Sequence, residues 1–332
     1  MPLVVGHVTR RQGARLARVV LLCMLGLGFH PALPESAGAL SATAQKSGTE
    51  ATLMAVHFQN ADKGWVVGGG GQVLKTSDGG KQWKAVPSGT RALLTGLVFS
   101  GPSQGWIIGA GGTILHTGDS GATWKPQVSG TQAALYGASF VSSTEGWVVG
   151  AGGTILHTID GGAHWTDQLS GSDATLYAVH FVDREHGTAV GALGAILVTG
   201  DGGKSWQARP TNSGATFFGL AFSSPTDGWA VGNAGAIFQT TDAGQRWVDR
   251  TLPCLQGCMR PTDLLRIRFT DRQTGWMVGE RGTIFRTQDG GVTWAERATS
   301  VKTVLYGLSF PDATRGWACG DKGTIFKIDA AR

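Results

Sequence analysis

The stretch GWVVGAGGTILHTIDGGAHW, residues 146–165, contains two groups of residues that could do chemistry. Its run of glycines could cradle a phosphate with backbone amides. Asp160, followed by two glycines and then a tryptophan, could supply a carboxylate to a hydrolytic site. However, residues 105–124 read GWIIGAGGTILHTGDSGATW, which is nearly the same string. Both features therefore recur as parts of a structural repeat.

The glycines lack the context of a phosphate site. A nucleotide-binding loop needs a strand, the glycines, and then a helix whose N-terminus faces the phosphate. Here a strand-like segment, ILHT, follows the glycines. Gly203, Lys204 and Ser205 imitate the end of a P-loop motif, but Val198 stands where that motif requires its first glycine. The sequence instead predicts a tight hairpin whose residues need a positive φ angle.

The carboxylate belongs to a motif, the Asp box, in which a threonine, an aspartate, a glycine and a tryptophan keep a fixed spacing. We interpret it as structural, because a carboxylate in a hairpin accepts turn amides while the tryptophan folds back on its own strands. The six copies are centred on Asp78, Asp119, Asp160, Asp201, Asp242 and Asp289.

Asp boxes occur in sialidases, but there they lie away from the chemistry. Sialidase-like hydrolysis would need an arginine cluster, a tyrosine nucleophile with a glutamate partner, and an acidic aspartate. The three tyrosines, Tyr136, Tyr177 and Tyr306, share one repeat position, which other copies fill with Met54, Thr95, Phe218 and Leu265. A position of that kind indicates packing, so we predict no catalytic residue. A carbohydrate-active propeller, either a sialidase-like glycoside hydrolase or a lectin, stays as the alternative.

The repeat period is 41 residues, the spacing from Trp65 to Trp106 and from Trp106 to Trp147. Gly-Trp pairs mark six copies, and Gly187-Thr188 falls on schedule for a seventh. The spacing from Trp229 to Trp276 is 47 residues, which indicates a six-residue insertion that we place within residues 251–263.

Each copy contains four short strand-like runs and no helical periodicity, which predicts an all-β, seven-bladed propeller of four-stranded blades. The last copy lacks its fourth strand, because the chain ends at Arg332. Residues 42–46 lie in the register of a fourth strand, so we expect the N-terminal segment to complete the seventh blade. The propeller is assigned to residues 40–332.

Residues 1–39 resemble a secretory signal peptide, with four arginines, an apolar run over residues 19–29 and a small-residue segment. The apolar run is too short to span a bilayer. The whole chain carries a net charge of +5, and removing the leader, with four basic residues and one acid, leaves +2. We therefore expect an exported, periplasmic protein that is monomeric and binds no nucleic acid.

The cysteines and histidines predict no metal site or cofactor. Cys254 and Cys258 lie four residues apart in the insertion of an exported chain, which favours a small disulfide over zinc. Cys319, within GWACG, is expected to be a buried free thiol. His116 and His157 share one repeat position, and His57 and His180 share another, which repeat structure explains.

The seven copies with GWxxG, GxGGTIL and TxDGGxxW resemble the photosystem II stability and assembly factor family, over residues 49–328. The resemblance implies a non-enzymatic, exported propeller that binds a protein subunit of a membrane complex during assembly. In a photosynthetic source, it implies the thylakoid lumen as the location.

We predict a partner-binding patch at the connection between the fifth and sixth blades. Arg266 takes a first-strand position that other copies fill with glycine or alanine, and Arg268 follows two residues later. Arginine is favoured as an interface anchor. The alternative is that Arg266 pairs with Asp263. The other residues assigned to the patch are Arg260, Asp263, Glu280, Arg281, Asp321 and Lys322.

Overall fold

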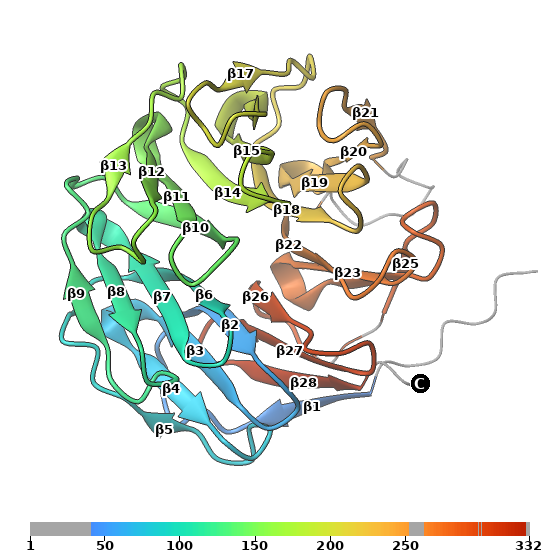
Figure 1. Ribbon diagram of the computed structural model, residues 1–332. Helices are drawn as coiled ribbons and strands as arrows, with labels where there is room; N and C mark the ends of the chain where they lie inside the picture. The colour runs from blue at the N-terminus through green and yellow to red at the C-terminus, as the bar shows by residue number, and fades with distance from the viewer. Residues whose placement is uncertain (1–40, 252–261, 298, 300, 330–332) are drawn as a thin grey trace, which may run out of the picture. The chain divides into compact units, whose positions relative to one another are not determined.

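The repeats fold into seven four-stranded antiparallel sheets, each of which is one blade. The computed structural model describes residues 41–251, 262–297, 299 and 301–329. Within the compact unit of residues 37–332, the first strand of each blade contacts the first strands of both neighbours, and β26 contacts β2 (Figure 1). The blades therefore close into a ring, which confirms the predicted seven-bladed all-β propeller.

Blade one is formed by β2 to β5, and each following blade takes the next four strands up to β25. The first strands of blades one to seven are β2 (Leu53–Phe58), β6 (Leu94–Ser100), β10 (Leu135–Phe140), β14 (Leu176–Phe181), β18 (Phe217–Phe222), β22 (Leu264–Phe269) and β26 (Leu305–Ser309). The second strands are β3 (Gly64–Gly68), β7 (Gln104–Gly109), β11 (Gly146–Gly150), β15 (Gly187–Gly191), β19 (Gly228–Gly232), β23 (Gly275–Gly279) and β27 (Arg315–Gly320). The third strands are β4 (Val73–Thr76), β8 (Ile114–Thr117), β12 (Ile155–Thr158), β16 (Ile196–Thr199), β20 (Ile237–Thr240), β24 (Ile284–Thr287) and β28 (Ile325–Asp329).

The outer, fourth strands are shorter than the others in blades one to six. They are β5 (Lys84–Ala85), β9 (Lys125–Gln127), β13 (Thr166–Asp167), β17 (Gln207–Ala208), β21 (Val248–Asp249) and β25 (Ala295–Glu296). In six blades a single 3-10 turn follows the second strand. These turns are η1 (Gly69–Gly71), η2 (Ala110–Gly112), η3 (Ala151–Gly153), η4 (Ala192–Gly194), η5 (Asn233–Gly235) and η6 (Glu280–Gly282).

Blade seven is completed from the other end of the described chain. β1 (Ser41–Gln45) pairs antiparallel with β28, so that Ala42 lies opposite Ile328, and the sheet order is β1-β28-β27-β26. The strand starts one residue earlier than residues 42–46, and the predicted closure is confirmed. With this closing strand, the seventh blade has four strands, as the other six blades have.

The hydrophobic core lies between neighbouring blades. Trp147 of β11 is fully buried and stacks on Phe181 of β14, with ring centroids 3.5 Å apart and planes at 8°. Phe181 in turn meets the Asp-box tryptophan of its own blade, Trp206, edge-on at 5.8 Å. The same series recurs around the ring, for example at Trp317 and Phe58. Blade four is the exception, because Thr188 stands there in place of the tryptophan of the Gly-Trp pair.

Each first strand carries a β-bulge after its first residue. In β2, Leu53 lies opposite Gly68 and Ala55 lies opposite Val67, so that Met54 is skipped in the ladder. The register shifts at the same place in the other six first strands. A bulge turns its extra residue out of the regular alternation. The second residue of every first strand is therefore aimed differently from its neighbours.

Candidate functional site

The ends of the strands form two chemically different faces. The Gly69 amide donates to the Thr52 carbonyl at 2.8 Å and the Gly71 amide donates to the Ala92 carbonyl at 2.9 Å, which joins the turn after β3 to the connections between blades. We call this side the turn face. At the other ends of the strands, the Gly79 amide of an Asp box donates to the Asp62 carbonyl at 2.9 Å. We call that side the box face.

The glycine-rich runs form the tight turns that the sequence predicts. In η1, Gly70 and Gly71 have φ angles of 67° and 74°, in the left-handed region. A Cβ atom at Gly71 would lie 1.9 Å from the Thr90 carbonyl oxygen, so only glycine fits. The Gly71 amide is already bonded, and β4 rather than a helix follows. These turns therefore have no phosphate-binding geometry.

In blades six and seven the turn residues carry charge. Arg281 and Lys322 occupy the left-handed position of Gly70, with φ angles of 56° and 53°. Left-handed backbone costs a side chain about 1–2 kcal/mol relative to right-handed backbone. Arg281 donates through Nε and Nη2 to the Thr262 hydroxyl, at 3.2 and 2.7 Å. Its neighbour Glu280 opens the same turn, so both charges stand on the turn face.

Asp321 connects blade seven to blade one. Its Oδ1 atom accepts a hydrogen bond from the Thr52 hydroxyl at 3.1 Å, and its Oδ2 atom lies 3.5 Å from the Tyr306 hydroxyl. Burial, followed by the charges of Asp321 and Glu280, raises the pKa of Tyr306. Tyr306 therefore stays neutral, and its hydroxyl stays a hydrogen-bond donor toward Asp321 on the turn face.

Asp263 and Arg266 do not pair with each other. The Asp263 carboxylate accepts the Ala234 amide at 2.8 Å, which ties the turn of blade five to the start of β22. Arg266 donates from Nη1 to the carbonyl oxygens of Phe218 and Leu265, at 3.1 and 2.9 Å. These hydrogen bonds are therefore not those of the alternative in which Arg266 pairs with Asp263. Arg260, Cys254 and Cys258 lie outside the described residues, as does most of the predicted insertion.

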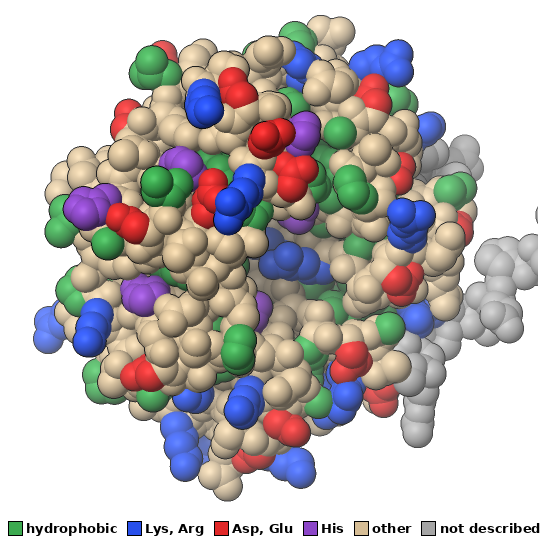
Figure 2. Space-filling view, in the orientation of Figure 1, with side chains coloured by type: hydrophobic (Ala, Val, Ile, Leu, Met, Phe, Trp, Pro, Cys, Tyr) green, Lys and Arg blue, Asp and Glu red, His purple; other side chains and the backbone are tan. Residues whose placement is uncertain are grey.

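Arg268 lies nearer the box face than Arg266, because β22 runs from the turn face at Leu264 to the box face at Phe269. Its residue is exposed although β22 is an innermost strand. Figure 2 shows one face hollowed at its centre, with lysine or arginine side chains inside the hollow. Surrounding protein lowers the pKa of Arg266 to about 10, with a further contribution from the charge of Arg268. Although solvent reaches Arg268, the protein that surrounds it on the inside of the ring partly desolvates its guanidinium and lowers its pKa.

Three aromatic side chains of neighbouring blades form a continuous arc at the bulged position of the first strands. The ring centroids of Tyr136 and Tyr177 are 5.1 Å apart, and those of Tyr177 and Phe218 are 5.3 Å apart. All three side chains are half-buried. Since this position is next to the start of the strand, the aromatic arc lies toward the turn face, near Arg266, which bonds to the Phe218 carbonyl.

The Asp boxes are local hydrogen-bonded turns. In blade four, Asp201 accepts the Thr199 hydroxyl at 2.8 Å and the Ser205 amide at 2.9 Å. Hydrogen bonds from the Ser205 hydroxyl and amide lower the pKa of Asp201 to about 2. The boxes at Asp78, Asp119, Asp160, Asp242 and Asp289 use the same threonine and the same turn amides. Their carboxylates are occupied by the turn and are not aimed at a common point.

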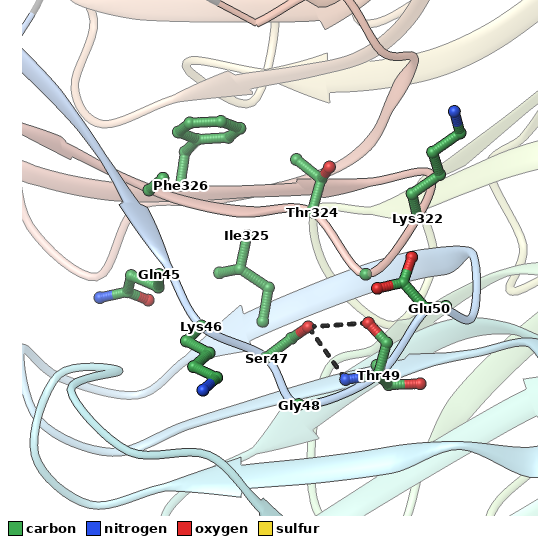
Figure 3. A pocket seen from close by; sticks show the side chains of 12 residues that line it. Gln45, Lys46, Ser47, Gly48, Thr49, Glu50, Lys322, Thr324, Ile325 and Phe326 are labelled. Carbon is green, nitrogen blue, oxygen red and sulfur yellow. Dashed lines mark hydrogen bonds between the residues drawn. The ribbon is translucent and has the colours of Figure 1, made fainter.

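A shallow cavity of about 410 Å³ lies where β1 meets the turn of blade seven (Figure 3). Ser47 holds its floor by accepting the Thr49 amide at 3.4 Å and donating to the Thr49 carbonyl at 3.2 Å. Cavities of about 420 Å³ lie at the corresponding places of blades one and four. A hollow that recurs with the repeat is a property of the blade, so this cavity is not assigned as a ligand site.

Among residues 41–251, 262–297 and 301–329, no group of three or more histidine, cysteine or carboxylate side chains could hold a metal ion. Within the same part of the chain, no helix is long and apolar enough to cross a membrane. Cys319 is a buried free thiol, as the sequence predicts, and burial raises its pKa.

The closed ring, the six Asp boxes and the glycine turns define this chain as a seven-bladed β-propeller built from Asp-box blades. Its sequence resembles the family described as photosynthesis system II assembly factor YCF48, whose sequence model matches residues 36–129 and 259–321. The second segment contains β22 and η6, with Arg266, Arg268 and Arg281. No curated protein matches the sequence.

Solved structures share the fold at low sequence identity. A structure described as YCF48 bound to D1 peptide is 21% identical, with a TM-score of 0.71, and the match covers 88% of this chain and 97% of the other. YCF48 from Cyanidioschyzon merolae is 20% identical, with a TM-score of 0.71 and coverage of 88% and 99%. A streptogramin B lyase is 14% identical, with a TM-score of 0.75 and coverage of 89% and 97%. These likenesses establish the fold but not the activity, which has to be inferred from the site.

Two features were not predicted as site residues. The tyrosines were interpreted only as packing, although Tyr136 and Tyr177 join an arc with Phe218, and His57 and His180 were explained only by the repeat. An alignment of the seven first strands contains the signal, because it brings the second residues together and the fifth residues together. The bulge that separates their directions is not visible in the sequence.

Proposed function

We propose that this chain is an exported, non-enzymatic scaffold that holds a protein subunit of a membrane-associated complex against its turn face. The observation that carries the proposal is the charge on the turns of blades six and seven. Arg281 and Lys322 adopt a backbone conformation that favours glycine, and neither is required there by the fold, since blades one to three have glycine at that position. Side chains kept at such positions are candidates for recognition.

The neighbouring surface suits a peptide segment. The aromatic arc offers half-buried apolar rings, Arg266 is fixed by two carbonyl oxygens beside it, and the Tyr306 hydroxyl lies beside Asp321. Tyrosine and arginine are the residue types on which interfaces most depend. The structure described as YCF48 bound to D1 peptide supports a protein segment as the ligand for a propeller of this shape.

The proposed location depends on the leader at residues 1–39. If it is removed on export, the propeller works in the periplasm, or in the thylakoid lumen of a photosynthetic source, on the side of the membrane where exposed loops and termini of membrane subunits are available. The net charge of +2 that remains supports a protein ligand over nucleic acid.

The competing function is a carbohydrate-active propeller. A glycosidase needs two carboxylates across the scissile bond, and a sialidase-like enzyme adds arginines close to them. Among the described residues, neither Arg266 nor Arg268 forms an ion pair with a carboxylate, and Asp263 accepts the Ala234 amide instead. This absence favours the scaffold over the hydrolase.

The test is charge reversal on the turn face. We expect Arg281→Glu with Lys322→Glu to abolish co-purification of membrane partners while changing the melting temperature by less than about 3 °C, because both side chains are exposed and surface substitutions cost little. The matched control is Arg272→Glu, an exposed arginine on the box face. Co-purification that survives the double substitution, or is lost equally in the control, would remove the assignment of the turn face.

A further inference from the structure

The fifth residue of each first strand forms a second ring inside the propeller, and Arg268 is its exception. The members of this ring are His57, Val98, Ser139, His180, Ala221, Arg268 and Ser309. Six of them are small or of medium size. Since the other six blades form the same strand without an arginine at this position, the fold does not explain the arginine in blade six.

The other polar members of the ring serve the joints between blades. His57 stacks on Phe99 and His180 stacks on Phe222, each with centroids 5.2 Å apart. The hydroxyl of Ser139 accepts the Phe181 amide at 3.0 Å. Arg268 does none of this, because it forms no hydrogen bond or ion pair with a described residue, and it is exposed although it stands on an innermost strand. Its guanidinium donors remain free for a ligand.

The groups that surround Arg268 make the middle of the ring positive. Burial, followed by the charge of Arg268, lowers the pKa of both His57 and His180 to about 4, although these histidines stand on blades one and four. Arg266 feels the same charge from its own strand. Among the described residues, no carboxylate forms an ion pair or hydrogen bond with any of these four groups.

A narrow passage with protein walls concentrates the potential of such uncompensated charges, because the walls screen them less than open water does. A guanidinium presents a planar set of donors that matches the oxygens of a carboxylate or phosphate. Neutral imidazoles at physiological pH add N–H donors. An anion between these groups would offset the repulsion between Arg266 and Arg268.

We propose that the centre of the ring is a binding site for a small oxyanion, a phosphate or a compact carboxylate, held by Arg268 and Arg266 with His57 and His180 around them. The oxyanion comes either as a free anion from the medium or as an anionic group of a bound partner. The site shares Arg266 with the proposed docking surface on the turn face, but it is defined by Arg268, so a free anion can bind there whether or not a subunit docks.

The test titrates the purified protein with inorganic phosphate and with citrate, at constant ionic strength set by sodium chloride, and follows binding by calorimetry. We expect saturable binding that Arg268→Gln weakens at least about tenfold, since a charge-assisted hydrogen bond is lost. Arg268→Lys keeps the charge without the planar set of donors, so its affinity should lie between that of the parent protein and that of Arg268→Gln. Arg272→Gln removes an equal charge from an exposed box-face residue and should leave binding unchanged.

The outcomes separate this site from the scaffold function. Absence of saturable binding of both probes, or equal binding by Arg268→Gln, would overturn the oxyanion site. If saturating phosphate blocks co-purification of membrane partners, the partner supplies the anion, and if it does not, the free anion is the ligand. The Arg281→Glu variant should bind phosphate normally even if it no longer retains a partner.

Discussion

Seven copies of one blade allow each residue to be compared with six counterparts in the same chain. Cys319 stands where other blades have Val67, Val149 or Val278, is fully buried, and places its Sγ atom 3.5 Å from the Leu53 carbonyl. Its pKa is raised by burial, so the reactive thiolate is suppressed. A residue type associated with chemistry is here a packing residue, whereas Arg268 breaks its repeat position without a hydrogen bond or ion pair to any described residue.

The Asp boxes predict how stability depends on acid. Hydrogen bonds within the turns lower the pKa of Asp119, Asp160 and Asp201 below the ordinary value, near 4 in an unfolded chain. The native state therefore binds fewer protons than the unfolded state in that range. Stability should be fully present above about pH 4 and should fall as the pH drops toward 2. Urea unfolding at a series of pH values from about 6 to about 2, on both sides of the ordinary aspartate pKa, measures this slope.

A single variant isolates the contribution of one box. Asp201→Asn should lower the melting temperature at neutral pH by about 2–4 °C and should make the acid dependence shallower, because one titrating carboxylate has gone. Asp167→Asn, on an exposed outer strand, is the control. If both variants keep the acid slope of the parent protein, the boxes do not carry it.

At the scale of strands, local signals in the sequence were sufficient for the boxes, the glycine turns and the order of strands, because each depends on residues within one blade. The joints between blades were less accessible. The sequence contains Trp147 and Phe181, but only the ring brings them from different blades to a stacking distance of 3.5 Å. The fate of Arg266 was open for the same reason, since its carbonyl partner Phe218 belongs to the preceding blade.

The joints predict a position-dependent cost of substitution in the second strands. Trp147→Ala should destabilise the protein by about 3–5 kcal/mol, because it removes a fully buried ring that stacks on Phe181. Thr188→Ala, at the same position of blade four, should cost about 1 kcal/mol, since no aromatic stack is lost. Denaturant unfolding of both variants compares the two joints, and equal losses would contradict the role assigned to the tryptophan.

Closure of the ring depends on β1 and β28, from opposite ends of the described chain, pairing in one sheet. Gln45, at the end of β1, donates to the Gly79 carbonyl at 2.8 Å and accepts from Trp83 at 3.4 Å, so the closing strand also reaches the Asp box of blade one. Gln127 and Gln168 do the same between other blades. The sequence predicted the closing strand from its register. It did not reveal this contact, which exists only once blades seven and one are adjacent.

Removal of the closing strand is the test at this scale. A variant that begins at Thr49 leaves β28 with an unpaired edge and takes away the Gln45 contacts to blade one. We expect it to melt at least about 5 °C below a variant that begins at Ser41, because several kcal/mol of pairing and packing are lost from one joint of the ring. The Ser41 variant controls for loss of the leader. Gln45→Ala should lower the melting temperature less than the deletion, since the strand still pairs with β28. Equal melting of the Thr49 and Ser41 variants would mean that β1 does not hold the ring closed.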